Sequence, residues 1–230
     1  MARIERLPPP PAEPVRSPAV TVRGETEALV DGRIDARVHV PATPKRAVVL
    51  CHPHPLYGGS MNSPVPLAIA KTLADVASDV VAWARFDFRG VGRSTGTHDD
   101  GRGEVDDARA VIEHLRALAP GVPLSVCGHS FGSWVGLRAA AADGRVDRVL
   151  LVGPSVRFFG SWDDALSFSG PKTIFLGDED EYCDVEEGRA LARRLGAELR
   201  VFEGFDHHFM KSRRTMAMAA IPVIAPEVSP

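Results

Sequence analysis

The sequence of 230 residues has only three cysteines, Cys51, Cys127 and Cys183, and they form no CxxC pair. Secreted disulfide frameworks use an even number of cysteines, so a reducing compartment is expected. No apolar run reaches the ~18 residues that a membrane helix needs, and no signal-peptide-like apolar stretch follows the charged N-terminal residues. These absences predict a cytoplasmic protein without a membrane partner.

Neither sign of charge is in excess, because 27 Lys and Arg residues face 30 Asp and Glu residues, for a formal net charge of −3. Nucleic acids are bound through a concentrated positive field, so no nucleic-acid partner is expected. Hydrophobic residues make up 44% of the chain. A domain of this length buries roughly 70–75% of the surface that its unfolded chain exposes. The composition predicts one domain that needs no disulfide or metal; it does not indicate an oligomeric state.

Proline is concentrated at the N-terminus, where six of the first 18 residues are proline. This density favours extended polyproline geometry and excludes a helix or a central strand. Such a segment can dock on an aromatic groove of a partner, but an unstructured leader is the simpler interpretation. We therefore expect a disordered tail over residues 1–18 and a single folded domain over residues 19–230.

The apolar pattern begins with short β-like segments at 20–22, 28–30 and 36–40, followed by a continuous run at 47–51 that is typical of a strand buried on both faces. Strand and helix patterns then alternate. The expected strands are 80–88, 124–127, 149–152, 173–176 and 199–202, and the expected helices are 64–76, 104–118, 131–142, 185–195 and 213–223. This alternation predicts an α/β fold with a mainly parallel sheet and helices on both faces. The three or four short strands before Ala47 are expected to form an antiparallel edge.

The pattern G-x-S-x-G occurs twice, at 92–96 and at 128–132. In a chain of this glycine content the odds against one chance match are only roughly ten to one, so the structural context must decide between the two matches. The nucleophile requires a sharp turn from a strand into a helix. Ser130 has this context, whereas Ser94 lies several residues beyond its strand in a long loop. The sequence predicts Ser130 as a nucleophile and Ser94 as a loop residue.

A serine nucleophile needs an imidazole to accept its proton and a carboxylate to orient the imidazole. Two loops that follow expected strands supply these groups, 177–181 and 204–209. In an open α/β sheet, functional residues gather at the carboxyl ends of the strands, where both loops lie. The candidate acids are Asp178, Asp180 and the nearby Asp184, and the candidate bases are His207 and His208.

Three longer motifs accompany this order of Ser, Asp and His: His-Pro-His-Pro-Leu-Tyr-Gly-Gly at 52–59, Arg-Phe-Asp-Phe-Arg-Gly-Val-Gly-Arg-Ser at 85–94 and Asp-His-His-Phe at 206–209. In combination they resemble the α/β-hydrolase superfamily, and more narrowly its small bacterial hydrolases, over about residues 20–222. The resemblance implies the α/β-hydrolase fold, with an antiparallel N-terminal edge and a minimal lid, over the domain expected at 19–230.

In that superfamily the acid usually ends a Gly-x-x-Asp pattern, which falls here on Asp180. The histidine follows a short glycine loop, which falls on His207. Asp178 and Asp184 stay as alternatives for the acid. Relatives have one histidine before the aromatic residue, so His208 is expected to be an exposed or supporting neighbour.

Acyl transfer builds negative charge on a carbonyl oxygen, and two backbone N–H groups normally stabilise it. One is expected from Phe131, directly after the nucleophile. Related hydrolases supply the other from a His-Gly-x loop after the strand at 47–51, but Pro53 has no N–H to give. His54 is the candidate for the second donor, with Leu56 and Tyr57 as alternatives.

His52 and His54 also have the spacing of metal ligands. A metal site needs further ligands, and the obvious ones, His207 and His208, already belong to the expected catalytic loop. We therefore expect His52 to be a loop histidine that hydrogen-bonds to nearby backbone, and we expect no metal.

The segment at 90–95 is one glycine short of the dinucleotide-binding pattern G-x-G-x-x-G, because Thr95 occupies its last position. No helix opens there to receive a pyrophosphate, so no cofactor is expected. The simpler interpretation is a tight glycine turn, with Asp87 and Arg89 bracing the loops around the nucleophile through ionic hydrogen bonds.

Only about sixteen residues separate Gly153 from Gly170, which is too few for the large lid of many lipases. Aromatic residues are dense there and either cap an apolar pocket or form the buried face of a short helix. The tentative pocket residues are Tyr57, Met61, Phe158, Phe159 and Trp162.

The sequence predicts a serine hydrolase that cleaves a small or medium carboxylic ester or thioester, a small-molecule acyl substrate, through an acyl-enzyme on Ser130. The same triad would also serve an acyltransferase, an amidase or a lyase. A non-catalytic binding protein that retains the fold is the alternative from another class.

Overall fold

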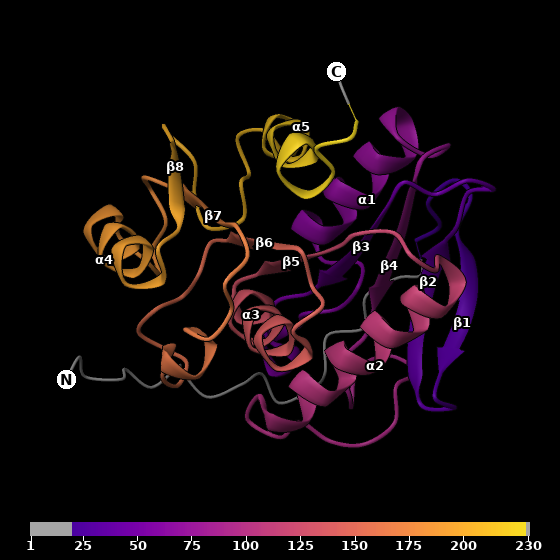
Figure 1. The fold of residues 1–230 in the computed structure, drawn as a ribbon. Helices are drawn as coiled ribbons and strands as arrows, with labels where there is room; N and C mark the ends of the chain where they lie inside the picture. Colours follow the sequence, from indigo (N-terminus) through magenta and orange to yellow (C-terminus); the bar gives the residue numbers. More distant parts are fainter. Residues whose placement is uncertain (1–19, 229–230) are drawn as a thin grey trace.

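A mixed sheet of eight strands forms the centre of the computed structural model, which describes residues 20–228 (Figure 1). The strands are β1 (Thr26–Val30), β2 (Ile34–His39), β3 (Arg46–Cys51), β4 (Val81–Phe86), β5 (Leu124–His129), β6 (Arg148–Val152), β7 (Lys172–Gly177) and β8 (Glu198–Phe202). Their order is β1-β2-β4-β3-β5-β6-β7-β8. The pairs β1–β2 and β2–β4 are antiparallel, and the remaining pairs are parallel. The expected parallel sheet with an antiparallel N-terminal edge is confirmed.

Helices cover both faces of this sheet (Figure 1). Helices α1 (Pro64–Val76) and α5 (Arg213–Ile224) pack on one face, and α2 (Arg102–Leu118), α3 (Phe131–Asp143) and α4 (Val185–Leu195) pack on the other. Two short 3-10 helices, η1 (Pro55–Tyr57) and η2 (Asp163–Ala165), lie in loops that follow β3 and β6. Strands β3, β4 and β5 are buried throughout, because the helical layers cover both of their faces.

The segment before β1 differs from the expectation. Residues 20–22 form no strand, so the expectation of three or four strands before Ala47 is wrong: among the described residues, only β1 and β2 precede β3. Long-range contacts hold the segment instead. The Arg23 guanidinium donates to the Ala74 carbonyl over 2.6 Å, and Glu25 forms an ion pair of 2.6 Å with Arg85, in which both side chains are fully buried. The segment thus packs against α1 and β4 without joining a ladder.

The N-terminal tail expected over 1–18 lies outside the described residues, and the division into tail and domain stays a prediction. None of the helices within residues 20–228 is long and apolar enough to cross a membrane. The three cysteines are free and buried. The cytoplasmic location also stays a prediction.

Candidate active site

A single residue, Ser130, connects β5 to α3. Its backbone has φ 54° and ψ −118°, a conformation that residues other than glycine rarely adopt and that costs roughly 1–3 kcal/mol. The Ser130 N–H donates to the Val152 carbonyl over 2.9 Å, which holds the turn against β6. The sharp turn expected from the sequence is therefore present, with Ser130 at the carboxyl end of the sheet.

The two glycines of the motif around Ser130 have a steric role. A Cβ atom on Gly128 would lie 2.0 Å from the Gly132 carbonyl oxygen. A Cβ atom on Gly132 would lie 2.5 Å from the carbonyl oxygens of both Cys51 and His52. The turn thus approaches its own helix and the end of β3 so closely that neither position has room for a side chain.

Ser94, in the second G-x-S-x-G match, has a structural use. Its buried hydroxyl donates to the Asp87 carbonyl over 2.6 Å and accepts the Asp35 N–H over 2.9 Å. These bonds join the residue after β4 to β2. Ser94 is a loop residue, as expected.

His207 and Asp180 meet at the carboxyl end of the sheet, from the loops that follow β8 and β7. The His207 Nδ1 atom lies 2.9 Å from Asp180 Oδ2, and both side chains are almost completely buried. The other oxygen, Asp180 Oδ1, accepts the N–H groups of Tyr182 and Cys183 over 2.8 and 3.2 Å. These bonds fix the carboxylate, so the Nδ1–H of His207 donates to it and Nε2 remains the acceptor in the neutral ring.

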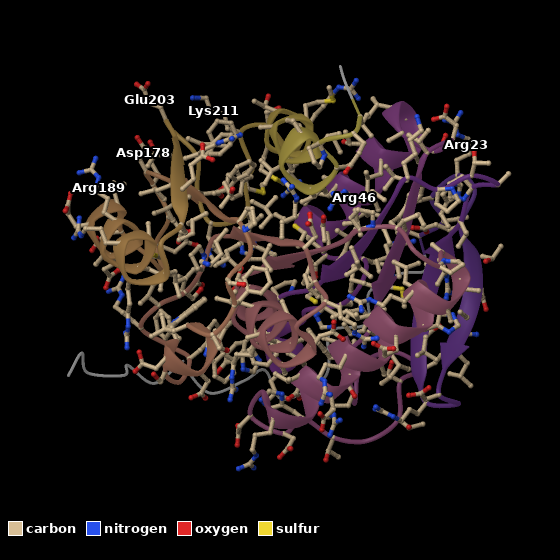
Figure 2. The ribbon with its side chains drawn as sticks, in the orientation of Figure 1. Arg23, Arg46, Asp178, Arg189, Glu203 and Lys211 are labelled. Atoms are coloured by element: carbon tan, nitrogen blue, oxygen red, sulfur yellow. The ribbon has the colours of Figure 1, made fainter. Side chains whose placement is uncertain are left out.

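The other two candidate acids are used elsewhere. Asp178 is exposed beside β8 (Figure 2), and its Oδ1 atom accepts the Gly204 N–H over 2.6 Å. Asp184 caps the N-terminus of α4, where it accepts the Glu187 N–H over 2.9 Å. Of the three carboxylates, the structure brings Asp180 to His207.

Two residues that the sequence analysis did not single out support His207. Gly153 has φ +53°, and a Cβ atom there would lie 3.0 Å from His207 Nδ1 and 3.3 Å from Asp180 Oδ2. His129 is buried, and burial lowers its pKa well below the ordinary value, so its ring is neutral. Its Nε2–H donates to the His207 carbonyl over 3.1 Å. The residue directly before Ser130 therefore fixes the loop that carries His207.

Ser155 is a further site residue that the sequence analysis missed. Its hydroxyl lies 3.1 Å from the hydroxyl of Ser130, and both side chains are buried. Ser155 follows β6, so its position after a strand was the signal that could have found it. A second hydroxyl therefore hydrogen-bonds to the expected nucleophile.

The loop that follows β3 carries the expected second oxyanion donor. The Leu56 N–H donates to His54 Nδ1 over 3.2 Å, and the Tyr57 N–H donates to the His54 carbonyl over 3.1 Å. Both alternative donors are thus used within the loop. Phe131 is the first residue of α3, so its N–H has no acceptor within the helix. This leaves Phe131 and His54 as the candidates from the two expected loops.

His52 lies at the base of the same loop and is fully buried. Its Nδ1–H donates to the Pro53 carbonyl over 2.6 Å, and its Nε2 accepts the Phe88 N–H over 3.0 Å. Burial lowers its pKa to about 3. His52 is therefore a neutral loop histidine bonded to backbone, as expected.

Asp87 and Arg89 brace the neighbouring loops. Asp87 accepts the Met61 N–H over 2.7 Å, while the Arg89 guanidinium forms an ion pair of 2.9 Å with Asp107 on α2. Burial raises the pKa of Asp87 to about 6. The two side chains hold the loops that follow β3 and β4 in place.

A cavity of about 250 Å³ opens beside Ser130 and His207. Its walls come from the loops that follow β3, β6, β7 and β8. The other lining residues are Pro53, His54, Tyr57, Gly58, Gly59, Ser63, Pro64, Ser155, Phe159, Tyr182 and His208. Tyr57 and Phe159 are thus placed as the sequence suggested, and the exposed His208 lies beside His207.

The other three tentative pocket residues do not line this cavity. Met61 is 3% exposed, and its backbone N–H donates to Asp87. Trp162 is 2% exposed and packs in the core on the α3 side of the sheet. The Phe158 ring packs edge-on against the Tyr182 ring, at 5.8 Å between centroids, outside the lining. In the loop between β6 and β7, the aromatic side chains other than Phe159 therefore pack against the protein and do not line the cavity.

Comparisons with known proteins agree with this fold. Residues 42–162 match the family described as serine aminopeptidase, S33. An uncharacterized protein of Rickettsia prowazekii is 32% identical over 192 residues, which cover 78% of this chain and 79% of the relative.

Two bacterial serine hydrolase structures are also similar. A serine hydrolase homologue from Coxiella burnetii is 27% identical with a TM-score of 0.78, over 90% of this chain and 100% of that one. A serine hydrolase without a lid from Xanthomonas campestris is 30% identical with a TM-score of 0.75, over 92% of this chain and 98% of that one. The chain thus belongs to the α/β-hydrolase superfamily, in the serine aminopeptidase S33 family, and is close to small bacterial serine hydrolases that lack a lid.

Proposed function

We propose that the protein is a serine hydrolase that cleaves a small or medium carboxylic ester or thioester through an acyl-enzyme on Ser130. One observation carries this proposal. Ser130 and His207 line the same cavity, and the Nδ1 atom of His207 is bonded to the buried carboxylate of Asp180. A strained serine, an oriented imidazole and an anionic partner are the three groups that activate a hydroxyl for acyl transfer.

In the first half of the proposed reaction, Ser130 Oγ attacks the substrate carbonyl carbon while its proton passes to His207 Nε2. Asp180 stabilises the imidazolium that forms. The N–H groups of Phe131 and His54 stabilise the negative charge on the carbonyl oxygen. When the tetrahedral intermediate collapses, His207 returns the proton to the departing alcohol or thiol, which leaves the acyl group as an ester on Ser130.

In the second half, water attacks the acyl-enzyme and gives a proton to His207 Nε2. The same two N–H groups stabilise the second tetrahedral intermediate. Its collapse releases the carboxylic acid and returns the proton to Ser130. The net reaction consumes one water and yields one acid and one alcohol or thiol.

Intact mass spectrometry after incubation with a fluorophosphonate tests this proposal. The wild type and Ser94→Ala are expected to gain one adduct, and Ser130→Ala is expected to gain none. Ser94 is the matched control, because it stands in the same sequence pattern with a buried hydroxyl. An adduct on Ser130→Ala, or no adduct on wild type with a native circular dichroism spectrum, would contradict the proposal.

A further inference from the structure

The walls of the cavity beside Ser130 carry no Lys, Arg, Asp or Glu side chain among the residues that the structure describes. The polar groups there include the hydroxyls of Ser63 and Ser155 and the imidazoles of His54 and His208. Burial lowers the pKa of His54 to about 4, and the partial burial of the His208 ring, together with its neighbour His207, lowers the pKa of His208. Apart from the catalytic histidine, the described walls are therefore uncharged at neutral pH.

The carboxylates next to these walls are already bonded. Asp180 accepts the His207 ring and two backbone N–H groups, and Glu181 accepts the His207 N–H over 3.4 Å. Glu104, fully buried at the start of α2, accepts the N–H groups of Asp99 and Gly101 over 2.9 and 2.8 Å. Each of these carboxylates thus accepts at least one donor of the protein itself, and none of them lines the cavity.

We propose that this site accepts uncharged acyl groups and excludes those with a free α-ammonium group, such as amino-acid esters and the N-termini of peptides. The inference rests on the proposed function, because the substrate carbonyl must contact Ser130. An α-ammonium group is then one carbon away and lies inside the cavity. It has three N–H donors, and a buried charge without an anionic partner is strongly disfavoured.

Under this proposal the chain does not have the aminopeptidase activity that its family's description names. An aminopeptidase must bind a free amino group beside the scissile carbonyl. The described walls of the cavity provide rings, hydroxyls and imidazoles but no carboxylate side chain that would pair with such a group. Esters of short, uncharged acids are the substrates that fit them.

The test compares ethyl 2-methylbutanoate with ethyl 2-aminobutanoate, whose α-substituents are similar in size but differ in charge. At pH 6 the amino group is protonated, since an α-amino group has a pKa of about 8. We expect kcat/KM to be at least ~100-fold higher for the uncharged ester. An α-ammonium group makes the carbonyl more electrophilic, so chemical reactivity alone would favour the other ester.

The ratio of kcat/KM for the uncharged ester to kcat/KM for the amino ester is then measured at pH 9, where the amino group is neutral. A ratio that falls at least tenfold supports exclusion by charge, because the titration of the enzyme itself divides out. A ratio that does not change would show exclusion by shape and would overturn the proposal. Equal or faster hydrolysis of the amino ester at pH 6 would also overturn it.

A variant provides an independent check. Ser63 lines the cavity and directly precedes α1, and its hydroxyl accepts the Ser60 N–H over 3.0 Å, a bond that a side-chain oxygen of Asp or Asn can also accept. Ser63→Asp adds an anion beside the acyl group and is expected to reduce the pH 6 ratio at least tenfold relative to Ser63→Asn. Equal ratios for the two variants would count against the proposal.

If the proposed function itself is wrong, neither ester is hydrolysed and no fluorophosphonate adduct forms, which distinguishes this outcome from a failure of the charge proposal. If Ser130 is labelled but neither ester is hydrolysed, the comparison is made with two phosphonate probes that bear an α-methyl or an α-ammonium group. Faster labelling by the uncharged probe at pH 6 supports the proposal, and the reverse order overturns it.

Discussion

The hydroxyl of Ser155 lies 3.1 Å from that of Ser130 and restricts its rotation. A neutral hydrogen bond of this kind contributes about 1 kcal/mol. Ser155→Ala is therefore expected to lower kcat/KM about fivefold without loss of the fluorophosphonate adduct. Steady-state kinetics on a turned-over ester measures this, with Ser167→Ala, at an exposed position, as the control. A Ser155→Ala variant as active as wild type would show that the contact has no role in turnover.

We expect Ser94 to contribute to stability and Ser130, the proposed nucleophile, to chemistry. Ser94→Ala leaves the buried N–H of Asp35 without its acceptor, which costs about 1–3 kcal/mol, but should leave turnover largely intact. Ser130→Ala should remove nearly all turnover and change the free energy of unfolding by less than about 1 kcal/mol. Urea denaturation and ester hydrolysis on the two variants check this crossed pattern. The opposite pattern would assign the nucleophile to Ser94.

The sequence predicted those site residues whose chemistry and position directly after a strand can be recognised locally. Asp180 and His207 were expected together, and the structure brings them together. Ser155 and His129 were missed, because a serine or a histidine acquires its role only when the fold brings a partner to it. No local pattern contains the contact between His129 and the His207 carbonyl, which are 78 positions apart.

The approach of α3 to the end of β3 depends on glycine. Gly132→Ala would place a Cβ atom 2.5 Å from two backbone oxygens, so the helix must move and displace Ser130. Gly144, at the other end of α3, has φ +69°, and a Cβ atom there would extend into open space, with none of the described residues in contact beyond its chain neighbours. Gly144→Ala should therefore cost only about 1 kcal/mol, the backbone penalty of the left-handed conformation.

We expect Gly132→Ala to lose at least ~3 kcal/mol of unfolding free energy, or to lose activity by at least ~100-fold, while Gly144→Ala keeps full activity. Thermal unfolding and ester hydrolysis measure the two effects. A Gly132→Ala variant that matches Gly144→Ala in both would show that the steric argument is wrong.

Hydrophobic periodicity predicted the helices and the parallel strands well, because each buries an apolar face. It failed at residues 20–22, which form no strand. The neighbouring Arg23 and Glu25 hold this part of the chain through partners more than fifty residues away. The tentative assignment of Met61, Phe158 and Trp162 to the pocket also failed, since an apolar side chain in a loop gives no sign of whether it faces a cavity or the core. These errors lie where tertiary contacts decide the structure.

Across the whole molecule, buried and half-buried histidines are expected to make stability depend on pH. The folded pKa values of His52 and His54 are about 3 and about 4, and that of His129 is well below its ordinary value. Each lies below the unfolded pKa of ~6.5, so the unfolded chain binds more protons as the pH falls. Asp87 acts oppositely, because its folded pKa of about 6 exceeds the unfolded ~3.9 and the folded state binds its proton first.

Three histidines oppose one aspartate, which leaves a difference of about two protons at pH 5, so the free energy of unfolding should fall by roughly 3 kcal/mol per pH unit there. Asp87→Asn removes the opposing contribution and should steepen this fall by about 1 kcal/mol per pH unit. Urea denaturation at pH 7, 6 and 5 measures both slopes. A slope that is the same in the variant and the wild type would show that Asp87 is ionised in the folded protein.

The segment between β6 and β7 supplies Ser155 and Phe159 to the cavity, and η2 is its only helix among the described residues. The strands on either side of it are fixed by their ladder partners, not by the length of this connection. Lengthening the connection would therefore add a cover over the cavity without shifting the register of the sheet. In evolutionary terms, an insertion in this segment would give the site a cover while Ser130, Asp180 and His207, which come from other segments, keep their places.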